Sequence, residues 1–203
     1  MEEKQLAEDL KFMRSMIERT HREIDPEAPV MIIWGLICMI GYPATQFLAT
    51  PQLYKWIWPM WTILWAIGVS VTIYSGVKVA RRERQSGLVS QLSKQIGWIW
   101  LILVVNGTIW TLMGLFKDYF GGPGFLWAAI YGFALSIMGI LYSKEWLYGG
   151  IAIFIAILAA FVIKFHAYVV LGIVMGLGCI IPALIAQRRW RRLRKEGERA
   201  ESG

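Results

Sequence analysis

The stretch Ile96–Phe116, IGWIWLILVVNGTIWTLMGLF, decides what kind of protein this is. It contains no charged residue, and near its middle lies Asn106, the only asparagine in the chain. A helix needs about 20 apolar residues to cross the roughly 30 Å of hydrocarbon in a bilayer. The sequence therefore predicts a membrane-spanning helix here.

Five similar apolar runs flank this stretch, and the connections between them are short. Short connections make neighbouring helices antiparallel and adjacent. The chain is 57% hydrophobic with a mean hydropathy of +0.50, which fits a protein embedded in lipid. We predict an all-α, polytopic membrane protein whose residues 30–187 form a six-transmembrane-helix bundle, with spans at about 30–49, 57–79, 96–116, 124–143, 146–164 and 166–187.

The basic residues predict the orientation of the bundle. Of the 21 Lys and Arg residues, five precede Val30, five lie in 78–94, one is Lys144 and seven lie in the C-terminal tail. The other side of the predicted bundle holds only Lys55, Lys117 and Lys164. Since cytoplasmic loops carry the excess of positive charge, we expect both termini in the cytoplasm and the bundle in the plasma (inner) membrane.

Residues 1–29 are predicted to form a cytosolic amphipathic helix. Its apolar residues recur at spacings of three and four, beginning with Leu6, Leu10, Met13 and Ile17, which is the pattern of a helix that packs on another helix. The segment has five basic and eight acidic residues, whereas a helix that lies on an anionic membrane surface is basic. We therefore expect it to pack on protein, either its own chain or a second copy.

The basic cytosolic tail, residues 188–203, follows the last predicted span. We expect Arg188, Arg189, Arg191 and Arg192 to bind anionic lipid headgroups, since basic residues beside a span are attracted to that leaflet. Nucleic acid is not an expected partner, because the basic residues cluster at the ends of the spans.

The predicted spans contain few residues that could support catalysis, ion transport or metal binding. Their interiors contain no Asp, Glu, Arg or His, the residues that mark proton relays and ion paths within a membrane. His21 and His166 are isolated, and Cys38 and Cys179 lie in apolar runs, so no metal site or cofactor is expected. We predict that the protein is not an enzyme.

One candidate ligand site stands out within the spans. Trp61 and Trp65 on the second predicted span, Asn106 and Trp110 on the third, and Trp127 on the fourth can line an outward-opening aromatic pocket with Asn106 at its floor. The alternative is that Asn106 makes an interhelical hydrogen bond and the Trp rings serve only packing.

The segments LWAIG at 64–68 and LWAAI at 126–130 are similar. Because apolar helices resemble one another through composition alone, this similarity does not establish an internal repeat.

These observations favour a membrane-embedded regulatory or scaffolding protein. Its spans would assemble with partners or sense an apolar ligand, and its N-terminal helix would carry the interaction. The alternative function is a small permease or channel for an uncharged or lipophilic solute, with Asn106, Trp65 and Trp110 lining the path.

Overall fold

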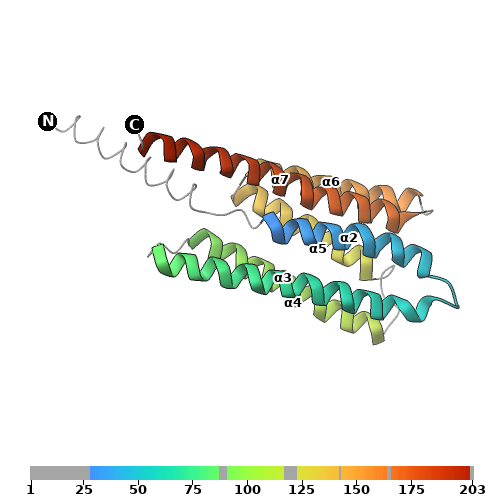
Figure 1. The fold of residues 1–203 in the computed structure, drawn as a ribbon. Helices are drawn as coiled ribbons and strands as arrows, with labels where there is room; N and C mark the ends of the chain where they lie inside the picture. The colour runs from blue at the N-terminus through green and yellow to red at the C-terminus, as the bar shows by residue number, and fades with distance from the viewer. Residues whose placement is uncertain (1–27, 87–90, 117–122, 142, 164–165, 202–203) are drawn as a thin grey trace.

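The computed structural model describes residues 28–86, 91–116, 123–141, 143–163 and 166–201, and all of its long elements are helices. Figure 1 shows them side by side in one elongated bundle. The all-α prediction is confirmed for these residues, while the predicted N-terminal helix lies outside them. The helices are α2 (Ala28–Leu48), the short η1 (Tyr54–Trp56), α3 (Ile57–Ser86), α4 (Gln91–Phe116), α5 (Pro123–Leu141), α6 (Lys144–Ile163) and α7 (Ala167–Glu201).

Five of these helices are long and apolar enough to cross a membrane, namely α2, α3, α4, α5 and α7. Several helices of this length and apolar content indicate a membrane protein. The six-span topology, which also requires α6 to cross, stays a prediction. Two helices extend well beyond the predicted spans, since α3 continues to Ser86 and α7 carries the basic tail as far as Glu201 without a break.

Four helices, α2, α5, α6 and α7, form the densest part of the bundle. α2 packs along α7, α7 along α6, and α6 along α5. At the α2–α7 contact the backbones are so close that a Cβ atom added to Gly35 would lie 2.9 Å from the carbonyl oxygen of Gly176. Small residues permit such close approach in lipid, where no hydrophobic effect draws helices together.

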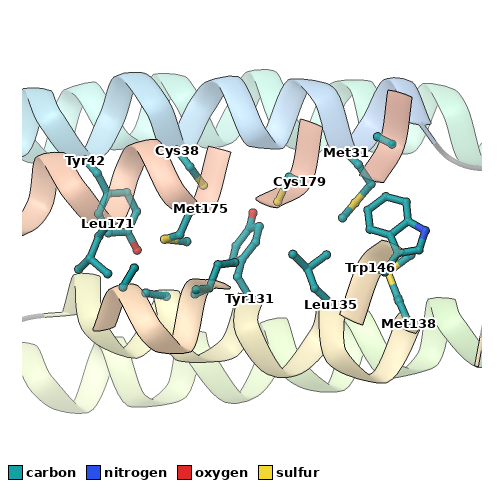
Figure 2. Close-up of a cluster of buried hydrophobic side chains, with 14 of the residues drawn as sticks. Met31, Cys38, Tyr42, Tyr131, Leu135, Met138, Trp146, Leu171, Met175 and Cys179 are labelled. Atoms are coloured by element: carbon teal, nitrogen blue, oxygen red, sulfur yellow. The ribbon is translucent and has the colours of Figure 1, made fainter. Parts of the chain in front are cut away.

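Apolar side chains fill the space between these four helices. The fully buried side chains include Leu135 of α5, Ile153 of α6, and Leu171, Met175 and Cys179 of α7. Figure 2 shows Tyr131 of α5 reaching toward the cysteine side chains of α2 and α7, and Trp146 closing the same core at one end. No polar or charged residue of the described part of the chain is buried, so the core is held by packing.

The α2–α3 and α4–α5 hairpins repeat the same set of side-chain contacts. In the first hairpin the indole N–H of Trp61 donates to Thr45 Oγ1, at 2.9 Å. In the second, the N–H of Trp127 donates to Thr111 Oγ1, at 3.0 Å. Each residue of the second pair lies 66 positions after its counterpart, since 127 − 61 and 111 − 45 are both 66.

Further contacts recur at the same offset of 66 positions. Trp34 donates to Thr72 and Trp100 donates to the sulfur of Met138. The rings of Trp34 and Trp65 make an edge contact at 5.7 Å, and those of Trp100 and Tyr131 make one at 5.6 Å. The two hairpins are therefore an internal repeat, in a register that pairs Trp65 with Tyr131 and not with Trp127.

α3 and α4 lie at the periphery of the bundle. α3 packs mainly on α2, and α4 mainly on α5, whereas the two make hardly any contact with each other among the described residues. Little of either span is buried, against nearly half of α2, α5 and α7. Their outer faces are therefore available to lipid or to another protein.

Candidate functional site

Tryptophan side chains gather where α2, α3 and α5 meet. The rings of Trp34 and Trp65 lie 5.7 Å apart, as do those of Trp65 and Trp127, and both contacts are edge-to-face. Tyr42 makes a similar contact with Trp61 at 5.6 Å. Edge-to-face pairs are favourable because the positive edge of one ring meets the negative face of the other. We call these five residues the aromatic cluster.

The polar atoms of the aromatic cluster are largely occupied within the chain. The indole N–H groups of Trp34, Trp61 and Trp127 donate to threonine hydroxyls, and the Tyr42 hydroxyl donates to the carbonyl oxygen of Gly124 at 2.7 Å. An unpaired donor is costly in hydrocarbon, so these bonds fix the rings in place. The aromatic cluster would therefore recognise a ligand by its shape and by its contacts with the rings.

The structure brings together only part of the predicted ligand site. Trp61, Trp65 and Trp127 belong to the aromatic cluster, and all three are partly buried. Asn106 and Trp110 are exposed on α4, and no hydrogen bond joins the Asn106 amide to another described residue. The expected intramolecular partner of Asn106 is therefore not found within the described part of one chain.

Two members of the aromatic cluster, Trp34 and Tyr42, were not anticipated from the sequence. The sequence signal that could identify Trp34 is the offset of 66 positions that relates it to Trp100. Each of these two tryptophans donates to the residue 38 positions later. Tyr42 has no comparable signal, because its contacts with Trp61 and Gly124 depend on how α2, α3 and α5 pack.

The two cysteines lie in the tight α2–α7 contact. Both Cys38 and Cys179 are free and buried (Figure 2). Thiols in such surroundings behave as small apolar groups.

An ion pair joins α6 to α7 at the end of the molecule where the basic residues of α7 lie. Arg189 Nη1 lies 3.9 Å from Glu145 Oε1, while Arg188, Arg191 and Arg192 are also exposed. The nearby Ser143 side chain, the backbone N–H of Glu145 and the Arg189 guanidinium lower the pKa of the Glu145 carboxyl. Three of the four arginines expected to bind lipid headgroups thus make no ion pair with a described residue, and the fourth has an acidic neighbour.

The segment with Leu6, Leu10, Met13 and Ile17 lies outside the described residues. Among the residues that are described, no group of three His, Cys, Asp or Glu side chains is arranged to hold a metal ion.

Comparison with protein-family models, with curated proteins and with solved structures gives no match for this chain.

Proposed function

We propose that this chain is a non-enzymatic integral membrane protein that acts as a regulatory or scaffolding protein. Its spans assemble with partners or sense an apolar ligand, and its N-terminal helix carries the interaction through Leu6, Leu10, Met13 and Ile17. In this proposal all six helices α2–α7 cross the plasma membrane and both termini are cytoplasmic.

The observation that carries this proposal is the filled centre of the bundle. Leu135, Ile153, Leu171 and Met175 meet between α5, α6 and α7 and are fully buried. A permeation path needs space and polar groups along the bundle axis, and apolar side chains occupy that region.

The aromatic cluster supports the ligand-sensing form of the proposal. Trp65 and Trp127 are only partly buried, so their rings offer apolar surface beside the lipid. The permease alternative requires Asn106, Trp65 and Trp110 to line one path. Within one chain Asn106 and Trp110 lie on an exposed face of α4 and Trp65 contacts α2 and α5, which favours the regulatory reading.

The test of the proposal uses trypsin on inside-out membrane vesicles that contain the full chain. If the N-terminal helix is docked on protein, Leu10→Asp with Ile17→Asp exposes it and speeds cleavage after Lys11 and Arg14 several-fold. Because a buried carboxylate destabilises the docked state while the spans still insert, the membrane content of the chain stays unchanged.

The matched control is Gln5→Asp with Ser15→Asp, which adds the same charge outside the apolar seam and leaves the rate of cleavage after Lys11 unchanged. Equal cleavage of the parent and the Leu10→Asp, Ile17→Asp variant would refute docking through this seam. Rapid flux of a neutral solute into vesicles reconstituted with the purified chain would instead establish the permease alternative.

A further inference from the structure

Asn106 is a polar side chain in an apolar position. It lies at the centre of the Ile96–Phe116 stretch, its side chain is exposed, and it has no hydrogen-bond partner among the described residues. An amide that faces hydrocarbon without a partner is strongly unfavourable, because water is absent at that depth. The exposed face of α4 around Asn106 is therefore expected to have a protein partner.

The internal repeat shows that the amide is a departure from the protein's own pattern. The position equivalent to Asn106 in the first hairpin, 66 residues earlier, is Ile40, which is 58% exposed. An isoleucine there suits contact with lipid chains. The second hairpin carries an amide at the same place, so lipid contact alone does not account for it.

The residues around Asn106 form a continuous seam. Ile99, Ile102, Asn106, Ile109 and Met113 follow one another at alternating spacings of three and four, the repeat of a left-handed helix pair. Ile102, Ile109 and Met113 are all more than half exposed, at 63%, 51% and 56%. The seam faces away from α5, which α4 contacts through Trp100, Gly107 and Thr111.

We propose that this α4 seam is a self-association surface, on which α4 of a second copy of the chain packs in parallel. Two copies inserted in the same direction are related by a two-fold axis along the membrane normal, and this symmetry places equivalent residues opposite each other at the same depth. The Asn106 amide has both a donor and an acceptor, so it pairs with the same amide of the second copy.

A single asparagine in an apolar seam also fixes the register of a helix pair. The inference deepens the proposed scaffolding function, on which it partly rests, by naming a second copy as a partner within the membrane. Its test involves α4 alone and leaves the N-terminal helix unchanged, so the two ideas can fail separately.

The first experiment is disulfide cross-linking of the full chain in membranes. Ile102→Cys and Met113→Cys lie on the seam, and the neighbouring Leu101→Cys and Leu112→Cys are matched controls on the same helix with similar exposure, 51% and 52%. Seam cysteines of a two-fold pair come within disulfide distance, whereas the control positions point elsewhere. The parent, with Cys38 and Cys179 both buried, is the blank.

We expect covalent dimers from the two seam variants and none from the two controls. Absence of dimers from all four variants, or equal amounts from seam and control, overturns the proposal.

The second experiment measures association by energy transfer between labelled copies in phosphatidylcholine vesicles. Asn106→Ile, which installs the residue of the equivalent position in the first hairpin, is expected to weaken association roughly three- to tenfold, the range of an interhelical amide bond in lipid. Asn106→Gln retains the donor and acceptor and should lose less. If Asn106→Ile associates as tightly as the parent, the amide does not hold the pair and the proposal is wrong.

Discussion

Two threonine hydroxyls in this bundle each donate one hydrogen bond and accept another. Thr45 Oγ1 accepts the indole N–H of Trp61 while its own proton goes to the carbonyl oxygen of Gly41, one turn back in the same helix. Thr111 makes the equivalent pair of bonds with Trp127 and Gly107. A hydroxyl that already bonds to its own helix needs no water, so it can serve as an acceptor within lipid.

Replacing either of these threonines by valine should destabilise the protein by a similar amount. Thr45→Val and Thr111→Val each leave an indole N–H without an acceptor, at a cost of about 1 kcal/mol in unfolding free energy. The free energy of unfolding of each variant in mixed micelles, titrated with denaturing detergent, measures the effect.

The control for this pair is Thr62→Val. Thr62 donates only to the carbonyl oxygen of Trp58 in its own helix, so its loss leaves no donor unpaired and should change stability little. If Thr45→Val and Thr111→Val differ widely from each other, the two hairpins are not energetically equivalent, whatever their geometry.

At the scale of elements, the helices of this bundle pack by two different means. α7 approaches both α2 and α6 at glycines, and α5 contacts α6 through Gly132 and Ser136. The peripheral α3 and α4 are instead attached through tryptophans that lie across Gly41 and Gly107. Close backbone contact gives the first group its dense packing, while the second group keeps most of its surface exposed.

A methyl group added at a tight glycine should separate α5 from α6. At Gly150 a Cβ atom would meet Ser136 Oγ and would lie 2.7 Å from the carbonyl oxygen of Gly132, and that backbone atom cannot rotate away. Gly150→Ala is therefore expected to cost about 1–3 kcal/mol in unfolding free energy.

Gly97→Ala is the matched control, because nothing lies within 4 Å of a Cβ atom there. Alanine favours a helix over glycine, so this variant should match the parent or gain up to about 1 kcal/mol. A thermal melt of the two variants in detergent distinguishes them, and equal melting temperatures would contradict the close α5–α6 contact.

At the scale of the whole molecule, the basic residues and the apolar helices together predict the membrane topology. The distribution of basic residues predicts cytoplasmic termini, and α6 must then cross the membrane in addition to the five candidate spans found among the described residues. Gln52 lies in the connection between α2 and α3, and Ser86 is the last residue of α3.

Labelling with a thiol reagent that does not cross membranes tests this topology in intact cells. Gln52→Cys should react from outside and Ser86→Cys should not, while both react after permeabilisation. The buried Cys38 and Cys179 of the parent serve as the background. Labelling of Ser86→Cys alone in intact cells would invert the orientation.

The sequence by itself determined the helical class of this protein and the presence of segments long and apolar enough to cross a membrane. Runs such as Ile96–Phe116 are read reliably because spanning about 30 Å of hydrocarbon demands both a minimum length and an absence of charge, and these are properties of a single segment.

Only the tertiary structure decided which faces of the helices are covered. Nothing in the local sequence says that Gly35 meets Gly176, that Trp65 pairs with Trp127 while its repeat counterpart is Tyr131, or that Asn106 faces outward. An apolar helix is hydrophobic all round, so its sequence carries no periodic signal that separates the lipid face from the protein face. The neighbours are chosen by the shapes that small and aromatic side chains present across the bundle, and those shapes exist only once the helices are assembled.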